Sequence, residues 1–265
     1  MHNLTVKIRD GNIDHCKIYT YPDGQRNVVL DMTYFNNPKY IIYISCQIKT
    51  FYDFELLHCL VTALRKNDFY IEKLDFKYLL GMRSDRSFEL GMPNYFRDVI
   101  SPQINMLNIP RIYILGGHSK LNALNNCEFY SLDLAFNGLK IAADESEFNR
   151  DKNREYMGFF HKERMDDNIK ISLNSQYSDF INKSDEWMPI LICDDLCDGG
   201  KTFIEIAKFM KSNFPARKLF LYVIHGIFSK GFSELLEYYE YIFTTNSYQD
   251  IDHPLVECIK VWSRQ

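Results

Sequence analysis

Short apolar runs of strand length alternate with segments of helical periodicity along most of this chain. The run 40–45 (YIIYIS) precedes a segment at 53–66 whose aliphatic residues recur at helical spacing, and a strand at 71–80, a helix at about 92–107 and a strand at 111–115 follow. This alternation is typical of βαβ units built around a mostly parallel sheet. The sequence therefore predicts the α/β fold class.

The second part of the chain repeats this order. Apolar runs fall at 139–143, 155–160, 169–173, 188–193, 218–224 and 241–245, with a charged turn between 160 and 169, and helices are expected at 202–210 and about 232–239. The chain has 265 residues, which corresponds to about two domains of ordinary size. We predict two tandem, doubly wound halves with mostly parallel sheets, at residues 1–125 and 126–265.

Composition and charge exclude several classes of protein. A hydrophobic fraction of 46% with 25% charged residues is that of a globular protein and excludes disorder. The net charge of −4 provides no overall positive field that would attract nucleic acid or anionic lipid. No apolar run is long enough to cross a membrane, and the N-terminus lacks the apolar core of a signal peptide. We expect a cytoplasmic protein with no nucleic-acid and no membrane partner.

The cysteines and histidines do not form a recognisable metal or disulfide pattern. The 7 cysteines are scattered without a C-x-x-C pair, and the 7 histidines do not lie at zinc-ligand spacing. Since a chain of this length needs no disulfides for stability, we expect buried free thiols.

One segment carries a strong indication of chemistry: ILICDDLCDGGKTF, at residues 190–203. A buried strand ends in Asp194 and Asp195, and a loop with two glycines then enters a helix. The glycines and the helix N-terminus can surround a phosphate with backbone N–H groups, and Lys201 and Thr202 would add contacts. The two carboxylates lie where open α/β sheets bind ligands, and can accept hydrogen bonds from sugar hydroxyls or hold Mg²⁺.

The alternative is that Asp194 and Asp195 are an ordinary polar strand end and that the glycines form a plain turn. Each piece alone would favour that interpretation, but the combination of strand, paired carboxylates, glycine loop and helix favours a phosphate site. The spacing excludes the Walker pattern, which needs two glycines five residues apart before Lys-Thr. It also excludes the dinucleotide fingerprint, which follows the first strand of its fold.

The segment at 190–202 resembles the ribose-phosphate loop of the class I phosphoribosyltransferase fold, and the rest of the chain resembles the PRPP synthetase (ribose-phosphate diphosphokinase) family. Six further segments are similar to motifs of that family, in the family's order: YPDGQ (21–25), MRSDR (82–86), GGHS (116–119), FHKER (160–164), HG (225–226) and TTN (244–246). The resemblance covers about residues 21–246 and implies two phosphoribosyltransferase-like halves.

The resemblance implies transfer of the β,γ-diphosphate of Mg-ATP to the anomeric hydroxyl of ribose 5-phosphate, which gives PRPP and AMP for nucleotide synthesis. Mg²⁺ is the implied cofactor and ATP the co-substrate. Lys162 and Arg164 would stabilise the transferring group, while His118 and Asp144 would hold the metal. The implied ATP-binding residues are Tyr21, Asp23, Gln25, Arg83, Ser84, Asp85, Arg86 and His118. The implied ribose-phosphate residues are Asp194, Asp195, Asp198, Gly199, Gly200, Lys201 and Thr202.

In the family, the element that 21–25 resembles borders the adenine of ATP bound by a neighbouring subunit. A homo-oligomer, a dimer or a hexamer, is therefore expected.

Several departures from the family pattern leave the acceptor open. Residues 143–147 (ADESE) stand where the family has its P-D-x-G-G diphosphate loop, and they lack both of its glycines. In the 5-phosphate loop the usual Thr is Gly199, and Lys201 adds charge. The missing Thr side chain would open space for a 5-phosphate that carries a further group. The alternative acceptor is ADP-ribose, which would give ADP-ribose 1-diphosphate. This acceptor would suit a divergent, phage-type member of the family that acts in NAD salvage. Two more functions stay open, namely a PRPP-consuming phosphoribosyltransferase and a non-catalytic protein that associates with active synthetases.

Overall fold

The structure is a computed structural model that describes residues 3–82, 84, 90–117, 123–150, 155–165, 168–173 and 175–262; the side chains of 150, 164–165, 168–169 and 175–176 are outside the description. The chain divides into two compact units, Met1–Tyr130 and Ser131–Gln265. The sequence predicted the border at residue 125. It lies after Tyr130 because Cys127–Tyr130 forms the edge strand of the first sheet.

The first unit is built on a six-stranded sheet with the strand order β2-β1-β5-β6-β7-β8. The strands are β1 (Asn3–Arg9), β2 (Asn12–Ile13), β5 (Ile41–Ile48), β6 (Tyr70–Leu79), β7 (Arg111–Leu115) and β8 (Cys127–Tyr130). All neighbouring strands are parallel except β1 and β2. A separate antiparallel hairpin joins β3 (Cys16–Thr20) to β4 (Arg26–Leu30).

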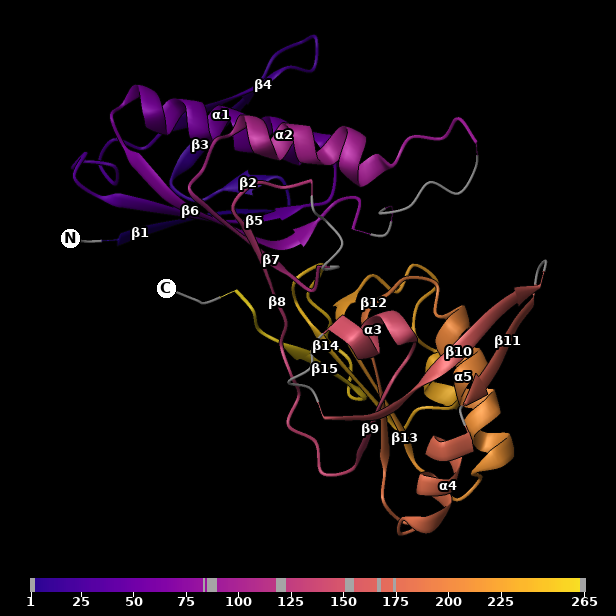
Figure 1. Ribbon diagram of the computed structural model, residues 1–265. Helices are drawn as coiled ribbons and strands as arrows, with labels where there is room; N and C mark the ends of the chain where they lie inside the picture. The colour runs from indigo at the N-terminus through magenta and orange to yellow at the C-terminus, as the bar shows by residue number, and fades with distance from the viewer. Residues whose placement is uncertain are drawn as a thin grey trace. The chain divides into compact units, whose positions relative to one another are not determined.

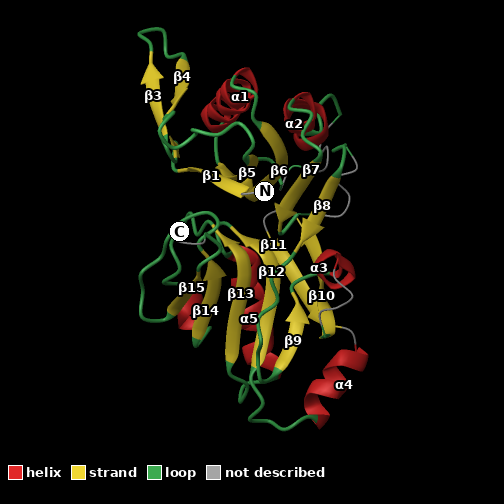
Figure 2. Cartoon of the chain, turned by 90° about the vertical axis from the view of Figure 1, so that its left-hand side faces the viewer, coloured by secondary structure: helices red, strands yellow, loops and turns green. Residues whose placement is uncertain are grey.

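Two helical segments cover one side of this sheet (Figures 1 and 2). Helix α1 (Phe51–Lys66) buries the aliphatic face that the sequence predicted, and a capping box between Thr50 and Asp53 fixes its start. The second segment begins later than expected, as the π-helix Phe96–Ile100, and continues as α2 (Ser101–Met106). Pro102 cannot donate a helical hydrogen bond, which is consistent with the irregular turn before it.

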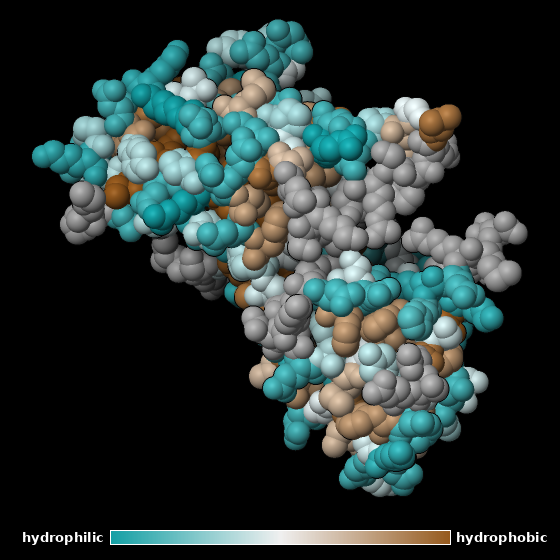
Figure 3. Space-filling view, in the orientation of Figure 1, coloured by the Kyte–Doolittle hydropathy of each residue, from teal (hydrophilic) through white to brown (hydrophobic). Residues whose placement is uncertain are grey.

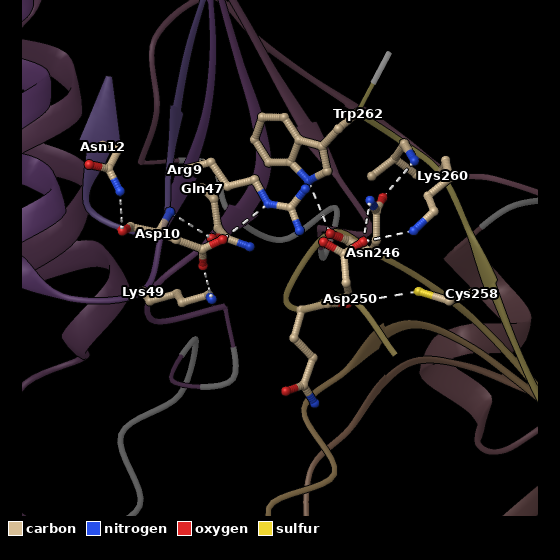
Figure 4. A network of polar contacts seen from close by, with 12 residues as sticks. Arg9, Asp10, Asn12, Gln47, Lys49, Asn246, Asp250, Cys258, Lys260 and Trp262 are labelled. Carbon is tan, nitrogen blue, oxygen red and sulfur yellow. Dashed lines mark hydrogen bonds and ion pairs between the residues drawn. The ribbon is translucent and has the colours of Figure 1, made fainter. Parts of the chain in front are cut away.

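Polar contacts around Asp10 hold the turn between β1 and β2 (Figure 4). Its carboxylate lies 2.8 Å from Lys49 Nζ and 3.3 Å from Arg9 Nε, and its backbone N–H donates to Gln47 Oε1 at 3.3 Å. These contacts fasten the turn to the end of β5.

The second unit contains a seven-stranded sheet with the order β11-β10-β9-β12-β13-β14-β15, seen face-on in Figure 2. Its strands are β9 (Leu139–Ala142), β10 (Tyr156–Met165), β11 (Asn168–Leu173), β12 (Ile190–Cys197), β13 (Leu219–Gly226), β14 (Tyr241–Thr245) and β15 (Val256–Ile259). Only β10 and β11 are antiparallel to each other. The α/β fold class with mostly parallel sheets is therefore confirmed for both halves.

Two expectations for the second unit were wrong. The charged turn expected between 160 and 169 is largely a hairpin, because Phe160–Met165 of β10 pairs residue by residue with β11. The helix expected at 232–239 is reduced to the three-residue 3-10 helix Leu235–Glu237. Tyr239, which lies just after this helix, is buried, and its hydroxyl donates to the Phe203 carbonyl at 2.8 Å.

Helices α3 (Glu145–Arg150), α4 (Ser175–Lys183) and α5 (Lys201–Asn213) complete the second unit. Helix α5 buries Phe203, Ile206 and Met210 in the core against β12 and β13. On the face shown in Figure 3, hydrophilic residues cover the end of this unit that carries α4. All 7 cysteines are free thiols. None of the described helices is long and apolar enough to cross a membrane.

Candidate functional site

The carboxyl ends of two neighbouring parallel strands, β9 and β12, bring candidate residues together at one edge of the second sheet. Asp144 follows β9, the paired carboxylates Asp194 and Asp195 lie near the end of β12, and the register places Cys193 beside Ala142 and Asp194 beside Val223. The strand continues to Cys197, so the two carboxylates belong to it and are followed by two more strand residues, which the sequence had not indicated. This edge is where open α/β sheets bind ligands.

Asp144 and Lys162 form an ion pair in this site. Lys162 Nζ, on β10, donates to Asp144 Oδ2 at 3.1 Å, and the backbone N–H of Glu147 donates to Asp144 Oδ1 at 2.9 Å. Burial raises the pKa of Asp144, but the charge of Lys162 and the Glu147 hydrogen bond outweigh it and hold the pKa below its ordinary value. Asp144 is therefore ionised at neutral pH, with one oxygen on each contact.

Asp194 has the opposite electrostatic balance. Burial raises the pKa of Asp194 well above its ordinary value, and the negative charge of Asp195 raises it further. Lys162 opposes this effect, while Asp144 and Glu147 add to it. Asp144, Glu147, Asp194 and Asp195 thus form a carboxylate cluster, and Lys162 is the cation in it that lowers the pKa of Asp194.

Glu147 is a member of this cluster that the sequence did not single out. Its side chain is 1% exposed, and its Oε1 accepts a hydrogen bond from the Tyr156 hydroxyl at 2.6 Å. The signal available in the sequence was its position in the short acidic segment 144–147. Such a segment is equally typical of a solvated turn, so only its burial identifies Glu147.

The glycine loop follows the end of β12 and leads into α5. Gly200 adopts φ +79° and caps the helix, which begins at Lys201. The carbonyls of Cys197 and Asp198 accept hydrogen bonds from the backbone N–H groups of Ile227 (2.9 Å) and Ser229 (3.1 Å). The loop is held by these backbone hydrogen bonds at its start and by α5 at its end. The N-terminus of α5, with its unpaired N–H groups, therefore lies next to the carboxyl end of β12.

Behind the loop, the motif residues at the ends of β13 and β14 form a buried polar network. His225 Nδ1 lies 2.7 Å from Ser247 Oγ, and Thr245 Oγ1 donates to the Ile224 carbonyl at 2.7 Å. Gly226 has no space for a side chain, since an added Cβ would lie 2.3 Å from the Phe228 ring. These residues support the site structurally.

Asn246 fastens the C-terminal segment to β14 (Figure 4). Its amide donates to Asp250 Oδ1 at 3.0 Å and accepts from the Val261 N–H at 2.8 Å, while its carbonyl accepts from Trp262 Nε1 at 3.0 Å. Lys260 also contacts Asp250, at 2.9 Å. The Asn246 side chain is therefore engaged in holding the end of the chain.

The candidate ATP-binding residues that the structure describes belong to the first unit. Tyr21, Asp23 and Gln25 form the exposed turn of the β3–β4 hairpin, where the Gln25 N–H donates to Asp23 Oδ1 at 3.1 Å. Ser84 follows β6, and its N–H donates to the Gly81 carbonyl at 2.9 Å.

Several predicted residues lie outside the description. Arg83, Asp85, Arg86 and His118 are not among the described residues, and Arg164 is described only by its backbone in β10. The metal, ATP-binding and catalytic roles that the resemblance implies for these side chains stay predictions.

The donor set of the cluster suits Mg²⁺. Within the described part of the chain, no three His, Cys, Asp or Glu side chains are arranged to hold a metal alone. Mg²⁺ commonly binds through one or two carboxylates together with substrate phosphates and water. Asp144, Asp194 and Asp195 offer such carboxylates, and a divalent cation would offset the negative charge that helps to raise the pKa of Asp194. The residues fit an ion shared with a bound substrate.

Comparison with known proteins supports the fold. No family model matches the sequence, and no curated protein matches it. Among solved structures, the chain is similar to the crystal structure of phosphoribosylpyrophosphate synthetase from Mycobacterium smegmatis, with a TM-score of 0.72 and 13% sequence identity. The match covers 98% of this chain and 95% of that chain. The chain has the two-sheet, phosphoribosyltransferase-like fold of that structure.

Proposed function

We propose that this protein is an ATP-dependent diphosphotransferase that moves the β,γ-diphosphate of Mg-ATP to the anomeric hydroxyl of a ribose 5-phosphate unit. Ribose 5-phosphate is the first acceptor, and PRPP and AMP are the products. One observation carries the proposal: the Asp144–Lys162 pair, the Asp194–Asp195 carboxylates and the glycine loop meet at one sheet edge.

In this reaction the anomeric oxygen of the ribose bonds to the β-phosphorus of ATP. The bond from that phosphorus to the oxygen bridging the α-phosphorus breaks, AMP leaves with this oxygen, and the hydroxyl proton passes to water. The protein needs no nucleophile of its own, so its contribution is positioning and charge stabilisation.

The residues of the second unit can take the acceptor's side of this reaction. The loop from Asp198 to Thr202 would hold the 5-phosphate on backbone N–H groups at the start of α5. Asp194 and Asp195 would accept hydrogen bonds from the ribose hydroxyls, which lie next to the phosphate in the acceptor. This arrangement would direct the anomeric hydroxyl toward Lys162.

Lys162 would stabilise the charge of the transferring diphosphate. Its side chain is 20% exposed, so it is partly withdrawn from water yet reachable by a ligand, and Asp144 fixes its position. Bound Mg²⁺ would supply further neutralisation of phosphate charge. We propose that Arg164 also stabilises the transferring group and that His118 takes part in holding the metal.

The experiment that tests this proposal measures AMP release. The full-length protein is incubated with Mg-ATP and ribose 5-phosphate, and AMP is quantified against a control without acceptor. Acceptor-dependent AMP supports the proposal. Absence of AMP with ribose 5-phosphate and with ADP-ribose would refute it.

ADP-ribose is the second candidate acceptor. It is favoured by Gly199, which places no side chain at the 5-phosphate, and by the exposed lysines around the loop. The same transfer would then give ADP-ribose 1-diphosphate, as used in NAD salvage. A PRPP-consuming phosphoribosyltransferase would use the same loop but would not depend on ATP, so ATP dependence separates these classes. If the protein has a non-catalytic role beside active synthetases, replacing Lys162 with alanine should cost little, whereas in an enzyme it should nearly abolish turnover.

We also propose that the protein acts as a homo-oligomer, a dimer or a hexamer. The exposed turn at Tyr21, Asp23 and Gln25 projects from the β3–β4 hairpin and would complete the ATP site of a neighbouring subunit. Size-exclusion chromatography tests this, because an active monomer would contradict it.

A further inference from the structure

The space left by Gly199 is covered by the side chain of Lys230. A Cβ built on Gly199 would lie 3.6 Å from both Lys230 Cδ and Cε and 3.8 Å from Cγ, which is ordinary van der Waals contact. The aliphatic stem of Lys230 therefore lies against the first of the two loop glycines. Its ammonium is one bond beyond Cε, so it is placed beside the phosphate loop.

Backbone contacts hold Lys230 in this position. The segment before it is hydrogen-bonded to the loop, since the N–H groups of Ile227 and Phe228 both donate to the Cys197 carbonyl. A tight turn then presents Lys230, with φ +47° at Phe228, φ +72° at Gly231 and a 2.8 Å hydrogen bond from the Gly231 N–H to the Phe228 carbonyl. The turn and the loop thus form one unit.

Two further contacts make this unit rigid. Gln249 Nε2 donates to the carbonyls of Gly226 and Ile227, at 3.2 and 2.9 Å. The Phe228 ring is buried and packs edge-on against Phe232, with centroids 5.8 Å apart. Lys230 is therefore an exposed side chain in a turn that is fastened by backbone contacts and by the buried Phe228 ring.

The ammonium of Lys230 is available to a ligand. Among the residues that the structure describes, no carboxylate lies within 4.0 Å of it and no hydrogen bond engages it. Lys201, the first residue of α5, places a second lysine on the other side of Gly200. Two lysines therefore lie beside the loop: Lys201 at the start of α5, and Lys230, from a separate turn, against Gly199.

We propose that Lys230 is a specificity-determining residue of this site, which binds the second phosphate of a ligand whose ribose 5-phosphate is extended by a diphosphate link. The loop and Lys201 bind the phosphate on the ribose, and Lys230 binds the next one. The proposal rests on the proposed function and names the acceptor class that the loop favours: ADP-ribose over ribose 5-phosphate.

Calorimetric titration of the full-length protein with ADP-ribose and with ribose 5-phosphate, without ATP, tests the proposal. The variants are Lys230→Gln, Lys230→Arg and the control Lys218→Gln, an exposed lysine before the opposite end of the same strand, β13. Loss of one charge-assisted contact should weaken ADP-ribose binding by about tenfold or more in Lys230→Gln. Ribose 5-phosphate binding should weaken by at most about threefold. Lys230→Arg and Lys218→Gln should bind both ligands like the wild type.

Each remaining result contradicts a definite claim. If Lys230→Gln binds both ligands like the wild type, or loses both equally, Lys230 does not select a second phosphate and the inference is wrong. If the wild type binds neither ligand, the ribose-phosphate loop itself is wrong and the proposed function fails with it. The titrations measure binding and need no turnover. They therefore still decide the role of Lys230 if the protein binds these ligands but does not catalyse diphosphotransfer.

Discussion

Lys162 Nζ lies 3.1 Å from Asp144 Oδ2, and this contact joins the middle of β10 to the end of β9 at the carboxyl edge of the second sheet. Lys162 is thus a cation among carboxylates, and its charge lowers the pKa of both Asp144 and Asp194. A lysine in this position can exchange its carboxylate partner for a phosphate oxygen when a substrate binds.

Replacing Lys162 with methionine should lower diphosphotransfer by about 100-fold or more, since it removes a charge aimed at the transferring group. Lys140→Met is the matched control, because Lys140 on β9 forms an ion pair with Asp133 at 2.8 Å in the same unit. It should retain wild-type turnover. Steady-state AMP release measures both, and equal activity of the two variants would show that Lys162 is not catalytic.

Replacing Asp194 with asparagine should stabilise the protein at neutral pH while reducing turnover. The raised pKa means that the folded state binds the Asp194 proton more tightly than the unfolded state does. The stability contributed by this group is therefore complete at low pH and is lost as the pH rises from the unfolded to the folded pKa. Asparagine does not titrate, so the variant does not lose this stability as the pH rises.

Thermal unfolding at two pH values measures this effect. A gain of about 1 kcal/mol corresponds to roughly 2–4 °C in a chain of this size, and it should be present at about pH 7 and absent at about pH 3. Asp252→Asn, at an exposed position, should leave the melting temperature unchanged at both. A destabilised Asp194→Asn variant at neutral pH would contradict the charge balance derived for the cluster.

Replacing Gly200 with alanine should weaken both the fold and the phosphate loop. Its φ of +79° costs an L-residue about 1–2 kcal/mol, and the added Cβ would also touch Leu235 at 3.4 Å. Gly11→Ala is the control, since Gly11 has φ +73° with no atom within 4 Å of the added Cβ. Both variants should lose stability in denaturant unfolding, but only Gly200→Ala should lose affinity for ribose 5-phosphate in titrations. Unchanged affinity of Gly200→Ala for ribose 5-phosphate would show that the loop does not bind this ligand.

Replacing Arg217 with methionine should cost about 3 kcal/mol of unfolding free energy. Arg217 is 4% exposed, and its guanidinium donates to carbonyls in the last turn of α4 and in the residues after it, namely those of Ile181 (2.5 Å), Ser184 (3.1 Å), Met188 (3.2 Å) and Asp185. Arg111→Met, at a side chain 64% exposed and paired with Glu72, should cost about 0.5 kcal/mol or less. Urea unfolding compares the two variants, and similar losses would contradict a stabilising role for the hydrogen bonds of Arg217.

The predicted elements that agree with the structure are those with a strong period. Helix α1 has a continuous aliphatic face, and β7 and β14 are short apolar runs whose bounds coincide with the prediction. Strands β8 and β15 were missed because their four residues mix polar and apolar types at partly buried positions. Helix α4 was missed for the same reason, since its sequence, SQYSDFINK, has few apolar residues.

For the site, the sequence predicted what lies within one continuous segment. The run from Asp194 to Thr202 needs only a strand, a glycine turn and a helix start, which are local features. The contact of Lys230 with Gly199 depends on two separate turns joined by backbone hydrogen bonds, and no periodicity signals it. The Asp144–Lys162 pair likewise depends on the alignment of β9 with β10.

The most direct test of the proposed activity is identification of the product by ³¹P NMR. The full-length protein is incubated with Mg-ATP and either ribose 5-phosphate or ADP-ribose. We predict that, with at least one acceptor, AMP forms in equal amount with a new diphosphate signal coupled to the anomeric proton of the ribose. ATP that stays intact with both acceptors, or that yields ADP and phosphate without a diphosphate on the anomeric carbon, would contradict diphosphotransfer.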